Sequence, residues 1–389
     1  MEKKIGAIVT GGDFQGLGVI RSLGEKGIPI VLIDHEYCIA KYSRYVTKCF
    51  KGPSPFNEKE YIQYLINLIK KEKLYDWIIF PNSDQIVYVI SKNKDVLSRF
   101  IKVPVPPIDT IKKVYDKKIT YKTCAINNIP IPKTYFSKSI TEILDYEFNY
   151  PIVLKPSIRD HFYSKVKKKA YRINNQDELK SVYNEVNKII DSEEILIQEL
   201  IDGGPKNLYS FCPYFKDGKV IASVTARRSR QHPMDFGHAT TFAEVVELPI
   251  LEELAVKFLS IINYQGICEV EFMYDEKTEQ FKLIEVNPRV WGWHTLAIAS
   301  GADLPYLLFL DETGERLPDI KTKKQMKWIR LTTDSVTVIK EIFHRRLKIT
   351  DYIKSLRGKK EFAVFSLKDP LPFFIELIII PYLWKKRGF

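Results

Sequence analysis

The 389-residue sequence lacks any apolar run that approaches the roughly 20 residues needed for a membrane-spanning helix. It begins with Met-Glu-Lys-Lys and a short apolar stretch, a pattern that is not typical of a secretory signal peptide. Its five cysteines are scattered, and no pair of them has the spacing of a metal site. These absences favour a reduced, cytoplasmic protein without a disulfide framework.

Internal repeats, low-complexity tracts and the spacing of a Ser–His–Asp or Cys–His nucleophile are also absent. The sequence is basic: it contains 60 Lys and Arg residues and 48 Asp and Glu residues, which give a net charge of +12. Such an excess favours nucleotides, phosphorylated substrates, nucleic acid or an acidic membrane as partners. A solvated lysine-rich surface explains it equally well.

The first hundred residues alternate apolar strands with helical segments. The strand expected at residues 5–10 runs into a turn containing Gly11, Gly12, Gly16 and Gly18, and a second strand at 28–33 ends in Asp34. This order is typical of a Rossmann-like unit. The glycine spacing does not match G-x-G-x-x-G, however, and tight strand-to-helix packing explains the glycines equally well. Binding of NAD is therefore the less favoured interpretation.

The rest of the chain continues as an α/β pattern and is too long for one compact core. The proline-rich segment 103–107 is expected to be a linker, and residues 110–127 a helix. Strands and helices then alternate as far as residue 286. We predict three units: residues 1–107, 108–310 and 311–389. The middle unit is expected to consist of two lobes, at about 108–193 and 194–310.

Carboxylates alternate with apolar residues in two neighbouring strands. Glu269 and Glu271 are two residues apart, so both side chains point to one face of their strand. The turn at 275–279 predicts a hairpin that brings Glu285 and Asn287 beside them. Carboxylates with an amide oxygen form the hard oxygen site that Mg²⁺ prefers on phosphates. The alternative is a solvent-facing edge hairpin without a metal.

Two further strands end in polar residues. Lys155 closes the apolar strand 152–155, where a lysine either reaches solvent or meets a phosphate. The apolar strand 195–201 ends in a turn with Gly203 and Gly204. Backbone groups there are suited to a flat heteroaromatic ring, with Glu199 as an acceptor for an amino group.

The order of these motifs resembles the ATP-grasp superfamily over residues 1–310. The resemblance rests on Asp116-Lys117, Leu154-Lys155-Pro156, Gln198-Glu199, Glu271 and the run from Glu285 to Arg289. Three further segments resemble the carboxylate–amine ligase branch that includes D-aspartate ligase-like proteins: 227–233, 235–237 and 287–294.

This resemblance implies a Rossmann-like pre-ATP-grasp domain, a two-lobed ATP-grasp domain and a C-terminal extension with an amphipathic tail. It implies an ADP-forming ligase that joins a small carboxylate, expected to be an amino acid, to an amine through an acyl phosphate. The cofactors would be ATP and Mg²⁺ or Mn²⁺. The implied phosphate-binding residues are Lys117 and Lys155, and the implied adenine-binding residues are Gln198, Glu199, Leu200 and Ile201. The implied metal ligands are Glu271, Glu285 and Asn287, and the implied catalytic arginines are Arg289 and Arg227.

The loop after Lys155 departs from the superfamily's pattern. Residues 157–169 contain no glycine, although such enzymes usually carry a glycine-rich loop over the phosphates. Lysine side chains in this polar loop would replace backbone amides as phosphate donors. Alternatively, the loop serves an anionic substrate, or catalysis is impaired.

Several alternatives stay open. Another ATP-grasp activity (a carboxylase or a kinase) would share the metal site, and a non-catalytic ATP-binding module on a membrane would bind ATP without turnover. The apolar tail 370–384 followed by Lys385, Lys386 and Arg387 suits a helix at the inner membrane interface. It suits equally a helix packed on the protein body or on a second copy in a homodimer. No nucleic acid is expected as a partner.

Overall fold

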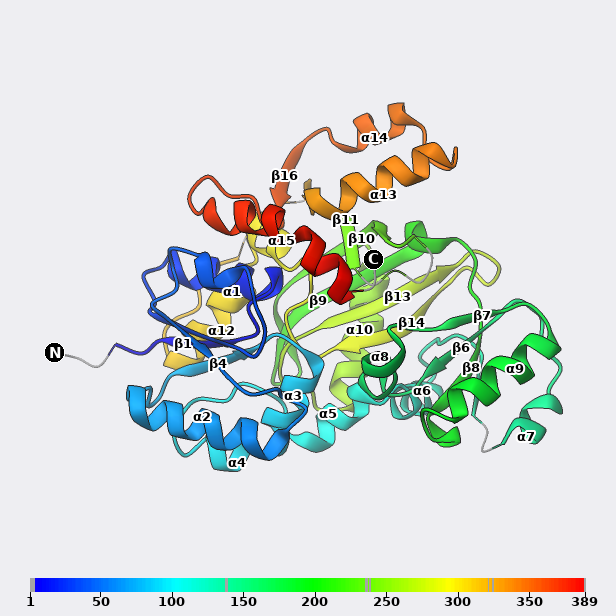
Figure 1. Cartoon of the computed structure of the whole chain (residues 1–389), viewed down its shortest axis with the longest axis horizontal. Helices are drawn as coiled ribbons and strands as arrows, with labels where there is room; N and C mark the ends of the chain where they lie inside the picture. The colour runs from blue at the N-terminus through cyan, green and yellow to red at the C-terminus, as the bar shows by residue number, and fades with distance from the viewer. Residues whose placement is uncertain are drawn as a thin grey trace.

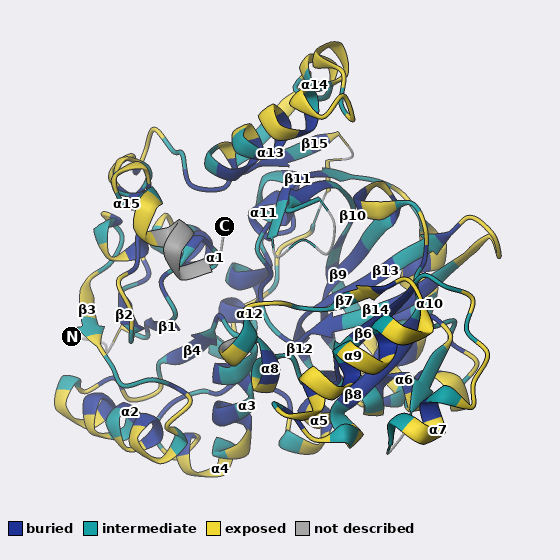
Figure 2. Ribbon diagram, turned by 45° about the vertical axis from the view of Figure 1, so that its right-hand side comes forward, coloured by how far each residue is buried: buried dark blue, intermediate teal, exposed yellow. Residues whose placement is uncertain are grey.

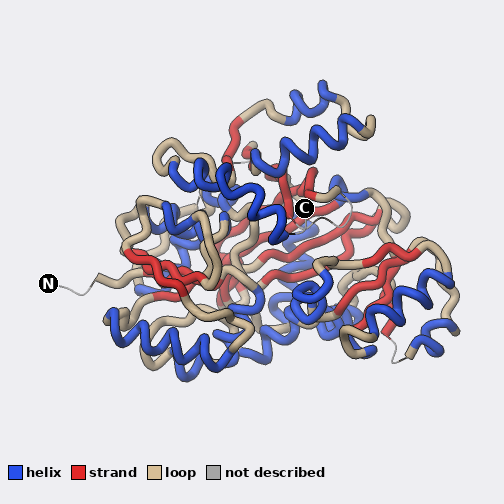
Figure 3. The backbone as a smooth tube through the Cα atoms, viewed as in Figure 1, coloured by secondary structure: helices blue, strands red, loops and turns tan. Residues whose placement is uncertain are grey.

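The computed structural model describes residues 4–136, 139–234, 237, 239–320, 322–323 and 325–387. Within these residues the strands form three sheets, one parallel and two mainly antiparallel (Figures 1 and 3). The predicted α/β class, with a parallel front sheet followed by the sheets of two lobes, is confirmed.

The front sheet has the strand order β3-β2-β1-β4, and all its pairs are parallel. Gly11 takes a φ of +92° at the end of β1, and a Cβ on Gly16 would lie 2.0 Å from the carbonyl oxygen of Gly11. The glycines therefore permit the tight turn into α1. The strands are β1 (Ala7–Thr10), β2 (Ile30–Asp34), β3 (Lys48–Lys51) and β4 (Ile78–Pro81). The helices of this part are α1 (Phe14–Gly24), η1 (Ala40–Tyr42), α2 (Glu58–Glu72), α3 (Asp84–Lys92) and α4 (Lys94–Leu97).

The segment 103–107 is packed against the front unit. Val103 and Val105 are buried, and the Ser91 hydroxyl donates to the Pro106 carbonyl oxygen at 2.6 Å. Helices α5 (Ile108–Tyr115) and α6 (Lys117–Ile126) follow, where the sequence predicted one helix. Asp116 breaks it because its backbone is extended and its carboxylate accepts from the Lys118 amide at 2.9 Å, which caps α6. Lys117 thereby becomes the first residue of α6.

The small lobe holds the four-stranded sheet β5-β8-β6-β7. Its apolar side chains form a core of their own with the facing helices, including Leu154, Tyr183 and Ile197. The strands are β5 (Thr134–Phe136), β6 (Ile152–Pro156), β7 (Tyr171–Ile173) and β8 (Ile195–Glu199). The helices are α7 (Ile140–Leu144), α8 (Arg159–Val166), α9 (Gln176–Asn187) and η2 (Ser192–Glu194).

The segment expected to be a polar loop, 157–169, contains helix α8. Without glycine its residues form two helical turns, with Asp160 in the first turn, and Lys167 ends the helix in the left-handed region at a φ of +60°. The expectation of a loop was therefore wrong for the centre of this segment.

The large sheet follows the order β14-β13-β9-β10-β11-β15-β16, with β12 paired to β9. Residues beyond 310 take part in it, because β15 pairs with β11 and β16 with β15. The strands are β9 (Leu208–Lys216), β10 (Lys219–His232), β11 (Ala239–Val245), β12 (Gly266–Ile267), β13 (Glu269–Asp275), β14 (Gln280–Asn287), β15 (Met326–Ile329) and β16 (Lys359–Phe362). The helices are η3 (Gly204–Asn207), α10 (Pro249–Ile261), α11 (Thr295–Ser300), α12 (Leu304–Thr313), α13 (Leu331–Phe343), α14 (Ile349–Ser355) and α15 (Leu371–Arg387).

The front sheet and the large sheet share their hydrophobic cores. One core joins Leu17 of α1 to Trp328 of β15, and a second joins Ile79 of β4 to Phe258 of α10 and Val270 of β13. The front unit and the large sheet therefore form one body, whereas the core of the small lobe is separate. Such a division permits the small lobe to move against the body.

The C-terminal helix α15 packs one face on this body. Glu376 is buried and accepts a hydrogen bond from Arg330 at 2.5 Å, and Ile375 and Ile379 lie against the core shared with the front unit. Of the alternatives considered for the tail, these contacts correspond to a helix packed on the protein body. The other face carries exposed apolar side chains: Leu371, Phe374, Leu377, Ile378 and Tyr382. Within the described residues, none of the helices combines the length and apolar character needed to cross a membrane.

Candidate active site

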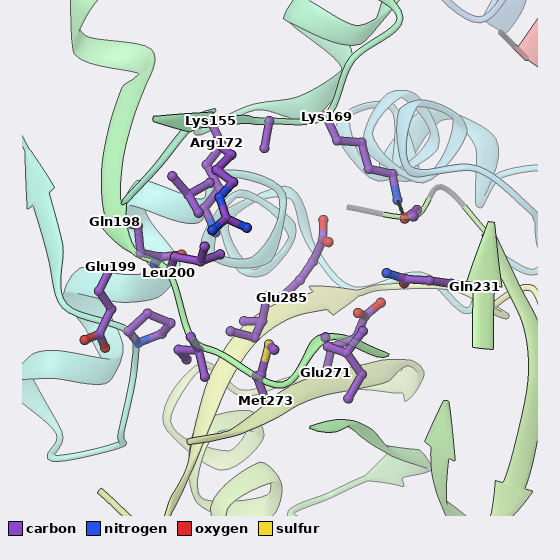
Figure 4. A pocket seen from close by; sticks show the side chains of 18 of the residues that line it. Lys155, Lys169, Arg172, Gln198, Glu199, Leu200, Gln231, Glu271, Met273 and Glu285 are labelled. Atoms are coloured by element: carbon purple, nitrogen blue, oxygen red, sulfur yellow. Dashed lines mark hydrogen bonds between the residues drawn. The ribbon is translucent and has the colours of Figure 1, made fainter. Parts of the chain in front are cut away.

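A cavity of about 650 Å³ lies between the small lobe and the large sheet. Figure 4 shows Lys155 and Lys169 reaching in from the small lobe, with Glu271 and Glu285 on the opposite wall. Eight of the residues named from the sequence line this cavity: Lys117, Lys155, Gln198, Glu199, Leu200, Ile201, Glu271 and Glu285. Arg227, Asn287 and Arg289 lie outside its lining.

The acidic wall is built by the register of β13 and β14. Glu271 lies directly opposite Glu285, and Glu269 lies opposite Asn287, so the predicted hairpin is confirmed. Directly opposed residues in an antiparallel pair have Cβ atoms about 5 Å apart. The alternation of apolar and acidic residues therefore places these oxygen donors on one face, away from the apolar core, and Glu271 and Glu285 of this face line the cavity.

The basic side of the cavity comes from α6, β6 and the start of β7. The Lys117 ammonium lies 2.7 Å from a carboxylate oxygen of Glu285, and Lys155 donates to the Tyr121 hydroxyl at 2.8 Å. Burial disfavours the charged form of Glu285, but Lys117 more than offsets this and holds the pKa of the carboxyl well below its ordinary value. Glu285 is therefore ionised throughout the physiological pH range.

Two lysines of the cavity have lowered pKa values. Desolvation and the nearby charge of Lys117 lower the pKa of Lys155 to about 7. Desolvation and the neighbouring Arg159 lower the pKa of Lys169 to about 7. Its ammonium donates to the Gly237 carbonyl oxygen at 2.9 Å. Both side-chain amines are therefore expected to take up a proton when an anion binds in the cavity.

An arginine of β10 meets the acidic wall, but it is Arg228 and not Arg227. Arg228 lies 2.7 Å from Glu271 and 3.7 Å from Glu269. Arg227 points away and pairs with Glu244 at 2.5 Å. Side chains alternate along a strand, and an irregular register between residues 227 and 230 further obscures which of the basic residues faces inward.

Asn287 and Glu269 lie behind the cavity lining. The Asn287 amide donates to Glu269 at 3.0 Å and to Glu271 at 2.9 Å. Burial and the neighbouring charge of Glu271 raise the pKa of Glu269 to about 8. This upward shift favours the protonated form of Glu269, which would relieve repulsion between the adjacent carboxyl groups.

Arg289 joins the large sheet to the front unit. Its guanidinium makes two hydrogen bonds of 2.8 Å to the carboxylate of Asp84, at the start of α3. Desolvation opposes the charged form, but Asp84 raises the pKa of Arg289 above its ordinary value. Asp84 follows the loop at the carboxyl end of β4, so this contact ties that loop to the acidic hairpin.

The segment after β8 forms another part of the wall. The Gln198 amide donates to the Thr134 hydroxyl at 2.8 Å. The Glu199 carboxylate accepts from the Lys133 backbone amide at 2.8 Å and from Lys282 at 2.6 Å. Since the Glu199 side chain already has these donors, backbone groups at Leu200 and Ile201 are better placed to meet a ligand.

Several polar lining residues were not named from the sequence as site residues, among them Arg159, Lys169, Arg172, Arg228 and Gln231. Two signals in the sequence pointed toward most of them: the glycine-free, lysine-containing segment 157–169, and the ligase-like segment 227–233, which contains Arg228 and Gln231. Asp235 and Phe236 of the ligase-like segments lie outside the described residues.

The donor set fits a magnesium ion. Glu271 and Glu285 offer adjacent carboxylates, and Asn287 adds an amide oxygen after rotation of its side chain. Arg228 and Lys117 now neutralise these carboxylates, as a cation would. Across the part of the chain that the structure describes, no cluster of three His, Cys, Asp or Glu residues could hold a metal on its own. Phosphate oxygens would therefore have to complete the coordination.

Part of the chain that forms this cavity is similar to a known ATP-binding domain. Residues 226–319, which include the acidic hairpin, match the family described as "Carbamoyl-phosphate synthase L chain, ATP binding domain". The chain belongs to the ATP-grasp superfamily.

Its relatives differ in what they make. This ATP-grasp chain is 23% identical to the D-aspartate ligase of Enterococcus faecium over 301 residues, which is 72% of this chain and 70% of the relative. It is 24% identical to the carbamoyl phosphate synthase large chain of Methanobrevibacter smithii over 79% of its own length, but it spans only 29% of that relative.

Solved structures show the same fold at low sequence identity. The L-amino acid ligase from Bacillus licheniformis has a TM-score of 0.65 and 14% identity, with 83% of this ATP-grasp chain and 78% of that chain covered. The N5-carboxyaminoimidazole synthetase from Staphylococcus aureus complexed with ADP has a TM-score of 0.66 and 18% identity, with coverages of 89% and 87%. The architecture is therefore shared by an L-amino acid ligase and an N5-carboxyaminoimidazole synthetase.

Proposed function

We propose that this ATP-grasp protein is an ADP-forming carboxylate–amine ligase whose carboxylate substrate is an amino acid. The observation that carries the proposal is the pairing of Lys117 and Lys155 with the opposed carboxylates Glu271 and Glu285 across one cavity. The sequence similarity to a D-aspartate ligase, which extends over 72% of the chain, supports the choice of an amino acid.

The cavity supplies what attack on a γ-phosphate requires. A carboxylate oxygen that approaches a triphosphate brings two anions together, so catalysis depends on fixed cations and in-line positioning. Lys117 and Lys155 would hold the phosphates, and Glu271, Glu285 and Asn287 would hold Mg²⁺. When bound, Mg²⁺ neutralises charge on the phosphate oxygens.

The reaction would proceed in two steps. A carboxylate oxygen of the acid bonds to the γ-phosphorus while the bond to the β-phosphate oxygen breaks, which releases ADP. The amine nitrogen then attacks the acyl carbon, inorganic phosphate leaves, and the nitrogen loses a proton. Arg228, which lines the cavity beside Glu271, and Arg289, held by Asp84, are proposed to stabilise the acyl phosphate. Arg227 stays a weaker candidate because Glu244 already pairs with it.

The small lobe is proposed to close over this intermediate. An acyl phosphate is sensitive to water, so the site must be sealed before the amine attacks. Helix α8 and Lys169 occupy the place expected for a glycine-rich loop, and Arg159 and Lys169 both line the cavity. Closure would then depend on side-chain charge in place of backbone amides.

The adenine would lie at the end of β8. Leu200 and Ile201 line the cavity beside Met273, which provides an apolar surface for a flat ring. The backbone at 199–201 would hydrogen-bond the ring edge, and Gln198 would support this strand through Thr134.

The front unit is proposed to bind substrate and not NAD. Its glycine turn is occupied by the protein's own groups, since the Gly12 amide donates to Asp34 at 2.6 Å and the Asp13 carboxylate accepts from the Phe14 amide at 2.9 Å. A dinucleotide would need the same turn for its pyrophosphate and the same acid for its ribose. We propose that the protein acts in the cytoplasm.

Hydroxylamine trapping tests the proposal. With Mg-ATP, hydroxylamine and a panel of carboxylates that includes D-aspartate and other amino acids, one acid should give a hydroxamate and stoichiometric ADP. Glu285→Gln should abolish the product, whereas Glu279→Gln should retain it, because Glu279 is exposed in the turn of the same hairpin.

The other outcomes separate the rivals. ADP release that depends on bicarbonate and gives no hydroxamate from any amino acid would indicate a carboxylase. ATP binding without turnover across the panel would favour a non-catalytic module. Thermal stabilisation by NAD but not by Mg-ATP would contradict the ATP-grasp interpretation of the cavity.

A further inference from the structure

The α13–α14 hairpin (residues 331–355) projects from the body of the molecule. It forms the uppermost part in both Figure 1 and Figure 2, which are related by rotation about the vertical axis. Helix α14 has no buried residue. Its contacts to the body include Ser355, which accepts hydrogen bonds from Arg230 at 3.0 Å and from Lys327 at 2.9 Å, and Tyr352, whose ring centroid lies 5.3 Å from the Arg230 guanidinium.

Both helices of the hairpin expose apolar side chains at a spacing of four residues. On α13 these are Ile339, which is 68% exposed, and Phe343, which is 83% exposed. On α14 they are Ile349 and Ile353, at 60% and 55%. Residues four apart lie on the same side of a helix, so each helix presents an apolar pair to its surroundings. Exposed apolar patches of this kind mark interaction sites.

Exposed basic residues flank these apolar pairs along the chain. Residues 339–359 contain seven Lys and Arg residues but only two acids, Glu341 and Asp351. Glu341 is buried, so Asp351 is the one exposed acid of this segment. The exposed basic residues are Lys340, Arg345, Arg346, Lys348, Lys354, Arg357 and Lys359.

We infer that the α13–α14 hairpin binds the surface of an anionic lipid bilayer. Apolar side chains insert at the level of the headgroups, and the surrounding cations meet lipid phosphates. A second copy of the chain fits less well, because a two-fold interface here would bring the two basic clusters together. Three of the four exposed apolar side chains are isoleucines, which gain nothing from a nucleic-acid backbone and cannot stack on bases as Phe343 could. This inference is independent of the proposed reaction and extends the membrane contact expected for the tail to a different surface.

Vesicle co-sedimentation of the full chain tests the inference without any turnover assay. We expect binding to vesicles of phosphatidylcholine with phosphatidylglycerol, little binding to phosphatidylcholine alone, and weakening with added salt. Replacing Arg345, Arg346 and Lys348 with Gln should weaken partitioning about a hundredfold, given the attraction of each cation to an anionic surface. Phe343→Ser with Ile353→Ser should weaken it at least about tenfold.

Matched variants elsewhere on the surface serve as controls. Ile126→Ser removes a side chain that is 80% exposed on α6, and Gln at Lys59, Lys71 and Lys180 removes three exposed cations of other helices. Both controls should bind vesicles as the unmodified chain does. All variants should unfold at unchanged temperature, because the replaced side chains are exposed.

Three results would overturn the inference. The first is absence of binding to anionic vesicles, and the second is binding that the hairpin variants do not weaken more than the controls. The third is a concentration-dependent dimer, or a complex with single-stranded RNA, that the Phe343→Ser variant abolishes while vesicle binding persists.

Discussion

Binding of ATP should draw protons into the cavity, because two of the lysines that line it are only partly charged in the free protein. Lys155 and Lys169 both have pKa values lowered to about 7. At pH 8 each would be protonated to about one tenth. Phosphate oxygens beside them restore the ordinary lysine pKa, so each should take up about 0.9 proton, or about 1.8 for the pair.

Affinity should follow the same linkage. The protonated lysines bind phosphate, so affinity is highest below the pKa of the free lysines and falls as pH rises above 7. An uptake of about 1.8 to 2 protons corresponds to a loss of affinity of about 60-fold to 100-fold between pH 8 and pH 9. Raised pH should therefore weaken Mg-ATP binding well before any lysine in the complex loses its proton.

Calorimetric titration with Mg-ATP in two buffers of different ionisation enthalpy measures this uptake. The difference in apparent enthalpy gives the number of protons, expected to be about 1.8 for the unmodified protein and about 0.9 for Lys155→Met or Lys169→Met. Lys122→Met, which removes an exposed lysine on α6, should leave the value unchanged. An enthalpy that does not depend on the buffer, or proton release, would refute the assignment of these lysines to the phosphates.

Three further variants test separate parts of the structure. Arg228→Met should lower kcat at least about a hundredfold, by analogy with the loss of one transition-state donor, whereas Arg227→Met should stay within about tenfold; equal losses would contradict the inward placement of Arg228. Glu376→Gln should lower the free energy of unfolding in urea by about 3–5 kcal/mol, because it leaves Arg330 charged and buried, and Glu315→Gln, on the surface, should not. Ile197→Ala should destabilise the small lobe by about 2–5 kcal/mol and speed hydrogen exchange in β6 and β8 but not in β9 or β13; equal acceleration in both would contradict the separate core.

The acidic hairpin could be predicted because its information is local. Alternating carboxylates at 269 and 271, a polar turn and a second acidic strand determine both the pairing and the face. The position of Lys155 at the cavity could also be predicted, because a charged side chain at the end of an apolar strand is expected to reach solvent or an anion and not the apolar core. For the glycine turn the sequence offered tight strand-to-helix packing and dinucleotide binding as alternatives, and the close approach of Gly16 to the Gly11 carbonyl oxygen accounts for the glycines by packing.

The features that were not predicted depend on irregular backbone or on distant contacts. Asp116 breaks a helix through a capping bond that the apolar pattern does not reveal. The irregular register of β10 decides between Arg227 and Arg228. The pairs Arg289–Asp84 and Arg330–Glu376 join residues 205 and 46 positions apart. Strands β15 and β16 are four residues each, too short for a periodic pattern to show.

Oxygen transfer from the carboxylate substrate tests the central claim most directly. The acid that gives a hydroxamate is labelled with ¹⁸O in its carboxylate and turned over with Mg-ATP and hydroxylamine, and the released phosphate is analysed by mass spectrometry. One labelled oxygen per molecule of inorganic phosphate is predicted, because the carboxylate oxygen bonded to the γ-phosphorus leaves with it. Unlabelled phosphate alongside labelled hydroxamate, with the second labelled oxygen recovered in AMP or in water, would contradict an acyl-phosphate route through this cavity.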